Sequence, residues 1–204
     1  MGKSSVGKSS LINNFLNIFY SFISRNSILY ETVTIFECYS ETYQLSDGSY
    51  VNCEIMDTGG QETFYALNRQ YYQRADCCIL VYDITNEDSF NECKRHYKQE
   101  INNNCKEGIK VILVGNKTDL EKDRKISTEM GAQFANENKY YFKETSCVTI
   151  SNVVDAFETI IVMTHNDMFK NEQIPTRNTI RLSKVNNNDS MENNSNKGKK
   201  KKCC

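Results

Sequence analysis

A phosphate-binding motif lies near the start of the sequence. The stretch GKSSVGKS at positions 2–9 fits the pattern G-x-x-x-x-G-K-S/T through Gly2, Gly7, Lys8 and Ser9. Glycines let successive backbone N–H groups close around phosphate oxygens, Lys8 adds positive charge for the β- and γ-phosphates, and Ser9 can ligate Mg²⁺ at a helix start. A flexible terminus rich in Ser, Lys and Gly is the alternative interpretation. We predict that a nucleotide's phosphates bind to this loop, at Gly2, Ser4, Ser5, Val6, Gly7, Lys8, Ser9 and Ser10.

A second motif, DTGGQE at 57–62, follows a short apolar run. An acidic residue at such a strand end, here Asp57, can hold the water shell of Mg²⁺, and the N–H of a following glycine can meet a γ-phosphate. A turn of this composition is otherwise common. Its position after a predicted strand is what makes it a candidate metal and phosphate site.

A third motif, NKTD at 116–119, also follows an apolar run. The Asp119 carboxylate can accept two hydrogen bonds from the N1–H and exocyclic amine of guanine, and adenine offers neither group there. A buried carboxylate left unpaired is costly, so Asp119 can select guanine over adenine. A polar loop with a helix N-cap is the alternative interpretation.

The elements that must position these motifs are short strands alternating with helices. Apolar runs predict strands at 36–45, 50–56, 77–83, 110–116 and 139–145, with a hairpin turn at 46–48 joining the first two. Helical spacing covers 87–103, 127–138 and 152–166. This alternation predicts an α/β fold with a mainly parallel sheet and helices on both faces. Ligands in such sheets bind at the carboxyl ends of strands, where all three motifs lie, so together they predict nucleotide binding.

Composition limits the remaining possibilities. The 204 residues suit one domain with a real core, and formal net charge is −1. Five lysines at 197–202 concentrate basic charge in one place, which argues against nucleic-acid binding by the body of the chain. The nine cysteines are scattered and form no CxxC pair, so we expect reduced thiols. From about residue 170 the chain is rich in Asn, Ser and Lys, and we predict a disordered tail over 170–204.

With these motifs in order, the chain resembles a small GTPase of the Ras superfamily, most closely the Rab family. The stretch YYQRADCCILVYDITNEDSF at 71–90 and the ending KKKKCC carry the resemblance as well. It implies the P-loop NTPase fold of the small-GTPase type, with GTP, GDP and Mg²⁺ as ligands. The implied activity is slow GTP hydrolysis by a molecular switch in vesicle trafficking.

The resemblance also assigns roles to individual residues. Thr34 becomes the switch I ligand of Mg²⁺, Gly60 the switch II glycine, and Gln61 the residue that orients the attacking water, while Lys8 stabilises developing charge. The predicted Mg²⁺ ligands are thus Ser9, Thr34 and Asp57, and the predicted catalytic residues are Gln61, Lys8 and Thr34. The implied base-binding residues are Asn116, Lys117, Asp119 and, in the loop that backs guanine, Ser146 and Cys147.

The tail resembles Rab prenylation tails. Cys203 and Cys204 would accept two prenyl groups, and the adjacent lysines would add attraction to an anionic membrane. Unmodified thiols are the alternative. The resemblance further implies an exchange factor, a GTPase-activating protein, effectors and a prenyl-binding chaperone as partners. It places the protein at the cytoplasmic face of intracellular membranes, cycling with the cytosol.

One departure from the family concerns the strand that normally leads into the phosphate-binding loop. Only Met1 precedes the loop here, and that strand is normally central, between the strands ending at Asp57 and Asp83. We therefore expect exposed ladder edges and a slot in the core, and interpret residues 1–169 as an N-terminally incomplete GTPase domain. Such a domain should bind little guanine nucleotide unless an apolar strand of about six residues is added upstream.

Two other functions stay open at this point. A divergent or truncated GTPase-like binding module with weak or no hydrolysis would keep the fold but not the reaction. A P-loop ATPase is disfavoured by NKTD.

Overall fold

The computed structural model describes residues 1–20, 36–45, 48–59 and 65–169, all within the unit Met1–Glu172. The predicted tail at 170–204 lies outside them, so the domain boundary at residue 169 stays a prediction. The strands are β1 Phe36–Gln44, β2 Tyr50–Thr58, β3 Cys77–Asp83, β4 Lys110–Asn116 and β5 Tyr141–Thr145. The α-helices are α1 Lys8–Tyr20, α2 Tyr65–Tyr72, α3 Glu87–Glu92, α4 Lys98–Asn104, α5 Thr128–Glu137 and α6 Val153–Phe169.

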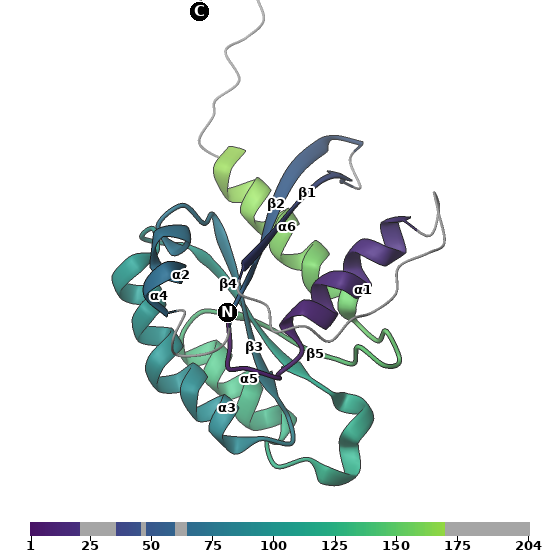
Figure 1. Ribbon diagram of the computed structural model, residues 1–204, viewed down its shortest axis with the longest axis vertical. Helices are drawn as coiled ribbons and strands as arrows, with labels where there is room; N and C mark the ends of the chain where they lie inside the picture. Colours follow the sequence, from purple (N-terminus) through teal and green to yellow (C-terminus); the bar gives the residue numbers. More distant parts are fainter. Residues whose placement is uncertain (21–35, 46–47, 60–64, 170–204) are drawn as a thin grey trace, which may run out of the picture. The chain divides into compact units, whose positions relative to one another are not determined.

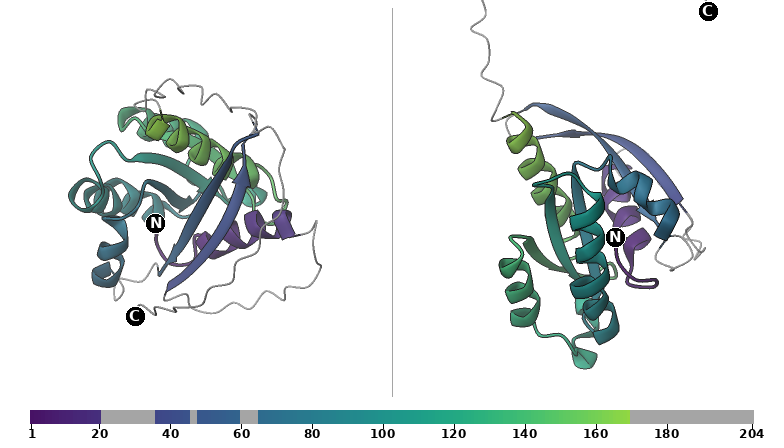
Figure 2. Two further views of the ribbon diagram at one scale, coloured as in Figure 1. Left: turned by 90° about the horizontal axis from the view of Figure 1, so that it is seen from above. Right: turned by 90° about the vertical axis from the view of Figure 1, so that its left-hand side faces the viewer.

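A parallel sheet in the order β3-β4-β5 lies at the centre of this unit (Figure 1). β3 and β4 occupy the predicted positions because their side chains are apolar on both faces and both faces are covered. The predicted hairpin is confirmed as the antiparallel pair β1–β2, which forms a separate two-stranded sheet (Figure 2). The α/β class is therefore correct, although the five predicted strands form two sheets among the described residues.

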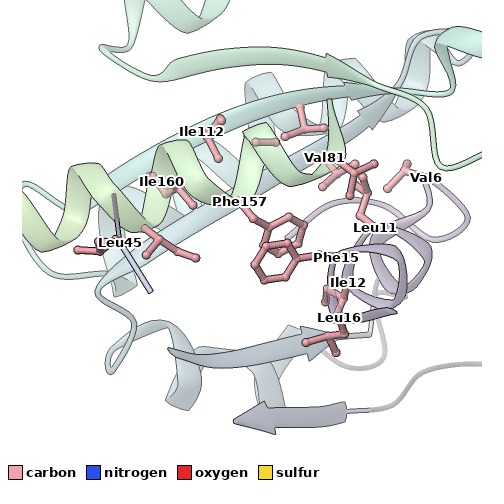
Figure 3. Close-up of a cluster of buried hydrophobic side chains, with 14 residues drawn as sticks. Val6, Leu11, Ile12, Phe15, Leu16, Leu45, Val81, Ile112, Phe157 and Ile160 are labelled. Carbon is pink, nitrogen blue, oxygen red and sulfur yellow. The ribbon is translucent and has the colours of Figure 1, made fainter. Parts of the chain in front are cut away.

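Helices cover both faces of the parallel sheet, as predicted. On one face α1 and α6 bury an apolar cluster in which Phe15 stacks on Phe157, with 4.2 Å between ring centroids (Figure 3). On the other face α3, α4 and α5 bury a second cluster that includes Tyr82, Phe90 and Ile101. These two clusters hold the strands whose carboxyl ends carry the motifs.

Local signals account for where the helices begin and end. Asn86 and Ser127 cap α3 and α5 by accepting hydrogen bonds from Ser89 N–H and Met130 N–H at 3.2 and 3.3 Å. The predicted helix at 87–103 is α3 and α4 joined through a π-helical turn, Cys93–Tyr97. The predicted strand at 139–145 begins later, at Tyr141, because Tyr140 N–H still bonds Ala135 O and closes the end of α5.

The predicted slot is a cavity of about 760 Å³ between β2 and β3. Among the described residues no strand lies between these two, and Met1 alone bonds to the free edge of β3. The cavity lining also includes residues of α1 and α6. We call this cavity the slot.

None of the helices in the described part of the chain is both long enough and apolar enough to cross a bilayer.

Candidate functional site

The phosphate-binding loop runs from Gly2 into the first turn of α1 at Lys8. Gly7 has φ +96°, and a Cβ there would lie 2.4 Å from Asn116 Nδ2. A side chain at Gly7 would therefore both strain the backbone and displace Asn116. The first N–H groups of a helix have no intrahelical partner, so α1 presents donors where the motif predicts phosphate. We call residues 2–10 together with Asp57 the phosphate edge.

The Lys8 side chain is held against the loop by the loop's backbone at Lys3. Its Nζ donates a hydrogen bond to Lys3 O at 2.9 Å. Burial lowers the pKa of Lys8 to about 8, and the Asp57 carboxylate acts in the opposite direction. The ammonium group is thus partly desolvated, which strengthens its attraction for an anion.

Asp57 lies at the carboxyl end of β2 and is only 1% exposed. Within the described part of the chain, neither of its carboxylate oxygens has a hydrogen-bond partner. A buried carboxylate without a partner destabilises the fold unless a cation or a hydrogen-bond donor binds to it. Carboxylate oxygen is the ligand that Mg²⁺ prefers, so Asp57 fits the predicted metal role.

Asn116, at the end of β4, ties the phosphate loop to the loops that follow β4 and β5. Its Nδ2 donates to Val6 O at 2.9 Å, and its Oδ1 accepts from Thr145 Oγ1 at 3.0 Å and from Cys147 Sγ at 3.6 Å. The side chain is 1% exposed. Because both ends of the amide are engaged by protein atoms, Asn116 positions the loops around it.

Asp119 stands in the loop after β4 and is exposed. Its Oδ1 accepts a hydrogen bond from Ser146 Oγ at 2.5 Å, and Ser146 Oγ in turn accepts from the backbone N–H groups of Val148 and Thr149. The carboxylate is therefore aimed before any base arrives, and the penalty for leaving it unpaired applies once a base covers it. We call residues 116–119 and 145–149 the base edge.

Lys117 has a left-handed backbone, with φ 73°, and forms an ion pair with Asp83 at 2.7 Å. Burial alone would raise the pKa of Asp83, but hydrogen bonds from Lys117 and Thr85 outweigh it and keep that pKa below its ordinary value. This pair fixes the aliphatic chain of Lys117 next to the end of β3.

Cys147 connects the base edge to α1. Its backbone carbonyl accepts a hydrogen bond from Asn14 Nδ2 at 2.7 Å. Burial raises the pKa of its thiol. The side chain therefore packs as a neutral group while its backbone stays in the loop.

Some predicted residues lie outside the described residues. These are Thr34, Gly60 and Gln61, and the two tail cysteines, Cys203 and Cys204. Next to them, Gly59 O accepts a hydrogen bond from Asn68 Nδ2 of α2 at 3.0 Å, which anchors the start of the DTGGQE turn. The predicted roles of Thr34, Gly60, Gln61 and the tail cysteines stay predictions.

Several residues that shape the site were not predicted. Asp83 could have been predicted as a site residue, because it ends a buried strand as Asp57 does. Thr145 and Asn14 had none, since their partners are 29 and 133 residues away along the chain.

Comparison with known proteins agrees with this geometry. A model of the Ras family matches residues 1–166. The chain is 36% identical over 201 residues to Ras-related protein RABA5b of Arabidopsis thaliana, covering 94% of this chain and 87% of that protein. The chain belongs to the Ras family. It is 37% identical over 161 residues to GTP-binding protein ypt3 of Schizosaccharomyces pombe, covering 79% and 72% of the two chains. It is also 33% identical over 168 residues to Ras-related protein Rab-11A of Dictyostelium discoideum, covering 82% and 75%.

The Ras-family match includes the phosphate edge, the base edge and α6 as far as residue 166. Together with the Rab and ypt relatives, it confirms the predicted Rab-like small GTPase, a GTP-hydrolysing switch in trafficking, and does not favour the binding-module alternative.

Proposed function

We propose that this Rab-like GTPase holds guanine nucleotide with its base at the base edge and its phosphates and Mg²⁺ at the phosphate edge. The observation that carries the proposal is the buried Asp57 carboxylate beside Lys8, which has no hydrogen-bond partner among the residues that the structure describes. Ser9, Thr34 and Asp57 would hold the metal. Mg²⁺, when bound, neutralises negative charge on the β- and γ-phosphates.

The chain's own groups divide the remaining tasks. The loop amides and Lys8 bind the phosphates, Asp119 accepts from guanine N1–H and the amine, and the backbone of Ser146 and Cys147 backs the base. Gln61 orients the attacking water, and Thr34 and Gly60 respond to the γ-phosphate, so that hydrolysis releases both switch segments.

Metal dependence tests this assignment. Release of fluorescent GDP should be slow in Mg²⁺ and at least about tenfold faster after chelation, because Asp57 loses its cation. Asp57→Asn should make release fast in both conditions. Asp76→Asn, at an exposed residue paired with Lys106, is the matched control and should keep the Mg²⁺ response. An Asp57→Asn variant that responds to Mg²⁺ like the parent would contradict the proposal.

Hydrolysis is tested separately at Gln61. Gln61→Leu should slow single-turnover hydrolysis while leaving GTP affinity unchanged, because the side chain acts on the water alone. An unchanged rate would remove Gln61 from the mechanism.

We also propose that Cys203 and Cys204 are prenylated and attach the protein to the cytoplasmic face of intracellular membranes. One lipid chain gives marginal binding, whereas two chains with a lysine cluster anchor stably. An exchange factor, a GTPase-activating protein, effectors and a prenyl-binding chaperone would act on this form. Changing both cysteines to Ser should move the protein from the membrane pellet to the supernatant of lysed cells, and a double variant that still pellets would refute the proposal.

A further inference from the structure

Asp83 is a charged residue at the carboxyl end of β3 to which none of the three motifs gives a role. Its side chain is only 8% exposed. In the parallel ladder it is the partner of Asn116 at the end of β4, so it lies at the same edge of the sheet as the base edge. A buried carboxylate is unfavourable without partners, and its partners therefore indicate what it does.

The two oxygens of the Asp83 carboxylate have different partners. Oδ1 accepts hydrogen bonds from Thr85 N–H and Thr85 Oγ1, both at 2.8 Å. Oδ2 lies 2.7 Å from Lys117 Nζ. The backbone N–H of Asp83 also donates to Ser89 Oγ at 3.0 Å. Because Thr85 and Ser89 fix Asp83 from its own part of the chain, Oδ2 is held in place to receive the lysine.

Lys117 lies in the part of the site that a nucleotide crosses. Asn116, which precedes it, donates to Val6 O of the phosphate edge, and Asp119 follows it in the base edge. About a third of the Lys117 side chain, 32%, is exposed. A nucleotide with its phosphates at the phosphate edge and its base at Asp119 would cover this exposed part of Lys117.

Covering Lys117 removes water from its ammonium group. A buried ammonium group without a counter-ion is strongly unfavourable. Among the described residues, Asp83 is the only carboxylate in an ion pair with Lys117. Burial raises the pKa of Asp83, but hydrogen bonds from Lys117 and Thr85 hold that pKa below its ordinary value, so the carboxylate is charged at neutral pH. The counter-ion is therefore in place before a base arrives.

A structural role in the turn after β3 is the alternative, and it uses other atoms of Asp83. The backbone carbonyl accepts a hydrogen bond from Asn86 N–H at 3.0 Å, and Oδ1 accepts both bonds from Thr85. An asparagine side chain could accept the same two bonds through its carbonyl oxygen. The turn therefore needs neither the negative charge nor Oδ2, and these are the parts that face Lys117.

We propose that Asp83 is a positioning residue for the purine ring, which holds Lys117 across the carboxyl end of the sheet and remains its counter-ion when the base covers it. This inference rests on the proposed guanine nucleotide site. It assigns Asp83 to the ring that guanine shares with hypoxanthine, and leaves the groups that distinguish the two bases to Asp119.

Asp83→Asn tests this role, because the amide keeps an acceptor for Thr85 and removes the charge. Competition against fluorescent GDP measures the affinities of GDP and of inosine diphosphate, which lacks the exocyclic amine of guanine. Both affinities should fall by the same factor, on the order of thirtyfold, so the ratio of the two should stay that of the parent chain. Asp155→Asn, in the ion pair with Lys143, is the matched control and should leave both affinities unchanged.

Two further variants separate the charge from the turn. In a Lys117→Met background, Asp83→Asn should change GDP affinity by less than about twofold, because the ammonium that needs a counter-ion is absent. Thr85→Val removes the hydroxyl bond to Oδ1 but keeps the ion pair, so GDP affinity should stay within about threefold of the parent.

Three results would overturn the proposal. Equal losses from Asp83→Asn with and without Lys117 would show that the carboxylate acts independently of the lysine. A loss in Thr85→Val as large as that in Asp83→Asn would assign the effect to the turn, and a lowered ratio of GDP to inosine diphosphate affinity would assign it to Asp119. Equal binding of the two nucleotides by the parent chain would instead refute base reading by Asp119, and the loss in Asp83→Asn would still test Asp83.

Discussion

The base edge and the phosphate edge of the same site are built differently. At the base edge the polar side chains already have protein partners, as in the Ser146–Asp119 and Asn116–Thr145 hydrogen bonds. At the phosphate edge Asp57 is buried without a partner among the described residues, and the slot lies alongside. The base edge is therefore preorganised to recognise the base. At the phosphate edge, the charged groups gain their partners only when the ligand binds.

The largest expected effect on nucleotide affinity comes from replacing the carboxylate with which the base edge accepts hydrogen bonds from guanine. Asp119→Asn should weaken GTP binding on the order of a thousandfold and strengthen binding of xanthosine triphosphate, because an amide can donate to the carbonyl that xanthine carries in place of the amine. Competition against a fluorescent nucleotide measures both affinities. Asp123→Asn, in the same 3₁₀ helix, Thr118–Asp123, is the matched control and should leave both unchanged. Retained GTP preference in Asp119→Asn would refute base reading by this residue.

The next largest effect is expected when the Asn116 hydrogen bonds that link the two edges are removed. Asn116→Ala should lower guanine nucleotide affinity about a hundredfold and the free energy of unfolding by about 2 kcal/mol, because Val6 O and the Thr145 hydroxyl lose a buried partner. Chemical denaturation and nucleotide titration measure the two losses. Asn52→Ala, which removes an exposed hydrogen bond from Thr42, should change stability by less than about 0.5 kcal/mol. Equal effects of the two substitutions would mean that Asn116 does not connect the edges.

A smaller effect is expected from pH at the phosphate edge. Because the pKa of Lys8 is lowered to about 8, phosphate binding should take up a proton at higher pH and affinity should fall about tenfold between pH 7.5 and 9. The unfolded chain keeps Lys8 charged above pH 8, so stability without nucleotide should rise through the same window as the buried ammonium is neutralised. Calorimetry at pH 8.5 in two buffers of different ionisation enthalpy measures the proton uptake. Binding with no proton uptake would show that Lys8 is fully charged before the ligand arrives.

The smallest effect is expected at Cys147. Cys147→Ala removes a weak S–H hydrogen bond to Asn116 but keeps the backbone that lies beside the base, so nucleotide affinity should change less than about threefold. Asn14→Ala tests the backbone anchor instead and should weaken binding more. A larger loss in Cys147→Ala than in Asn14→Ala would assign the thiol itself to the base.

These differences also explain what could be predicted from the sequence. β3 and β4 were predicted with correct bounds because continuous apolar runs identify strands covered on both faces, and Asp57 and Asn116 were singled out because they end strands. The tether from Asn116 to Val6 was not predictable, because it joins residues 110 positions apart. The helix α2 was not predicted, because its 8 residues span too few turns for a helical pattern to be distinguished in the sequence.

The slot was predicted from the absence of one strand, but its single Met1 rung could be found only from the positions of backbone atoms.

Competition between GDP and ADP tests the central claim most directly. With Mg²⁺ present, GDP should displace a fluorescent guanine nucleotide at a concentration at least about a thousandfold lower than ADP, because Asp119 is already aimed by Ser146. Chelating Mg²⁺ should weaken both ligands and leave their ratio nearly unchanged, since the metal acts at the phosphate edge. Equal displacement by ADP and GDP would contradict a preformed guanine-reading edge.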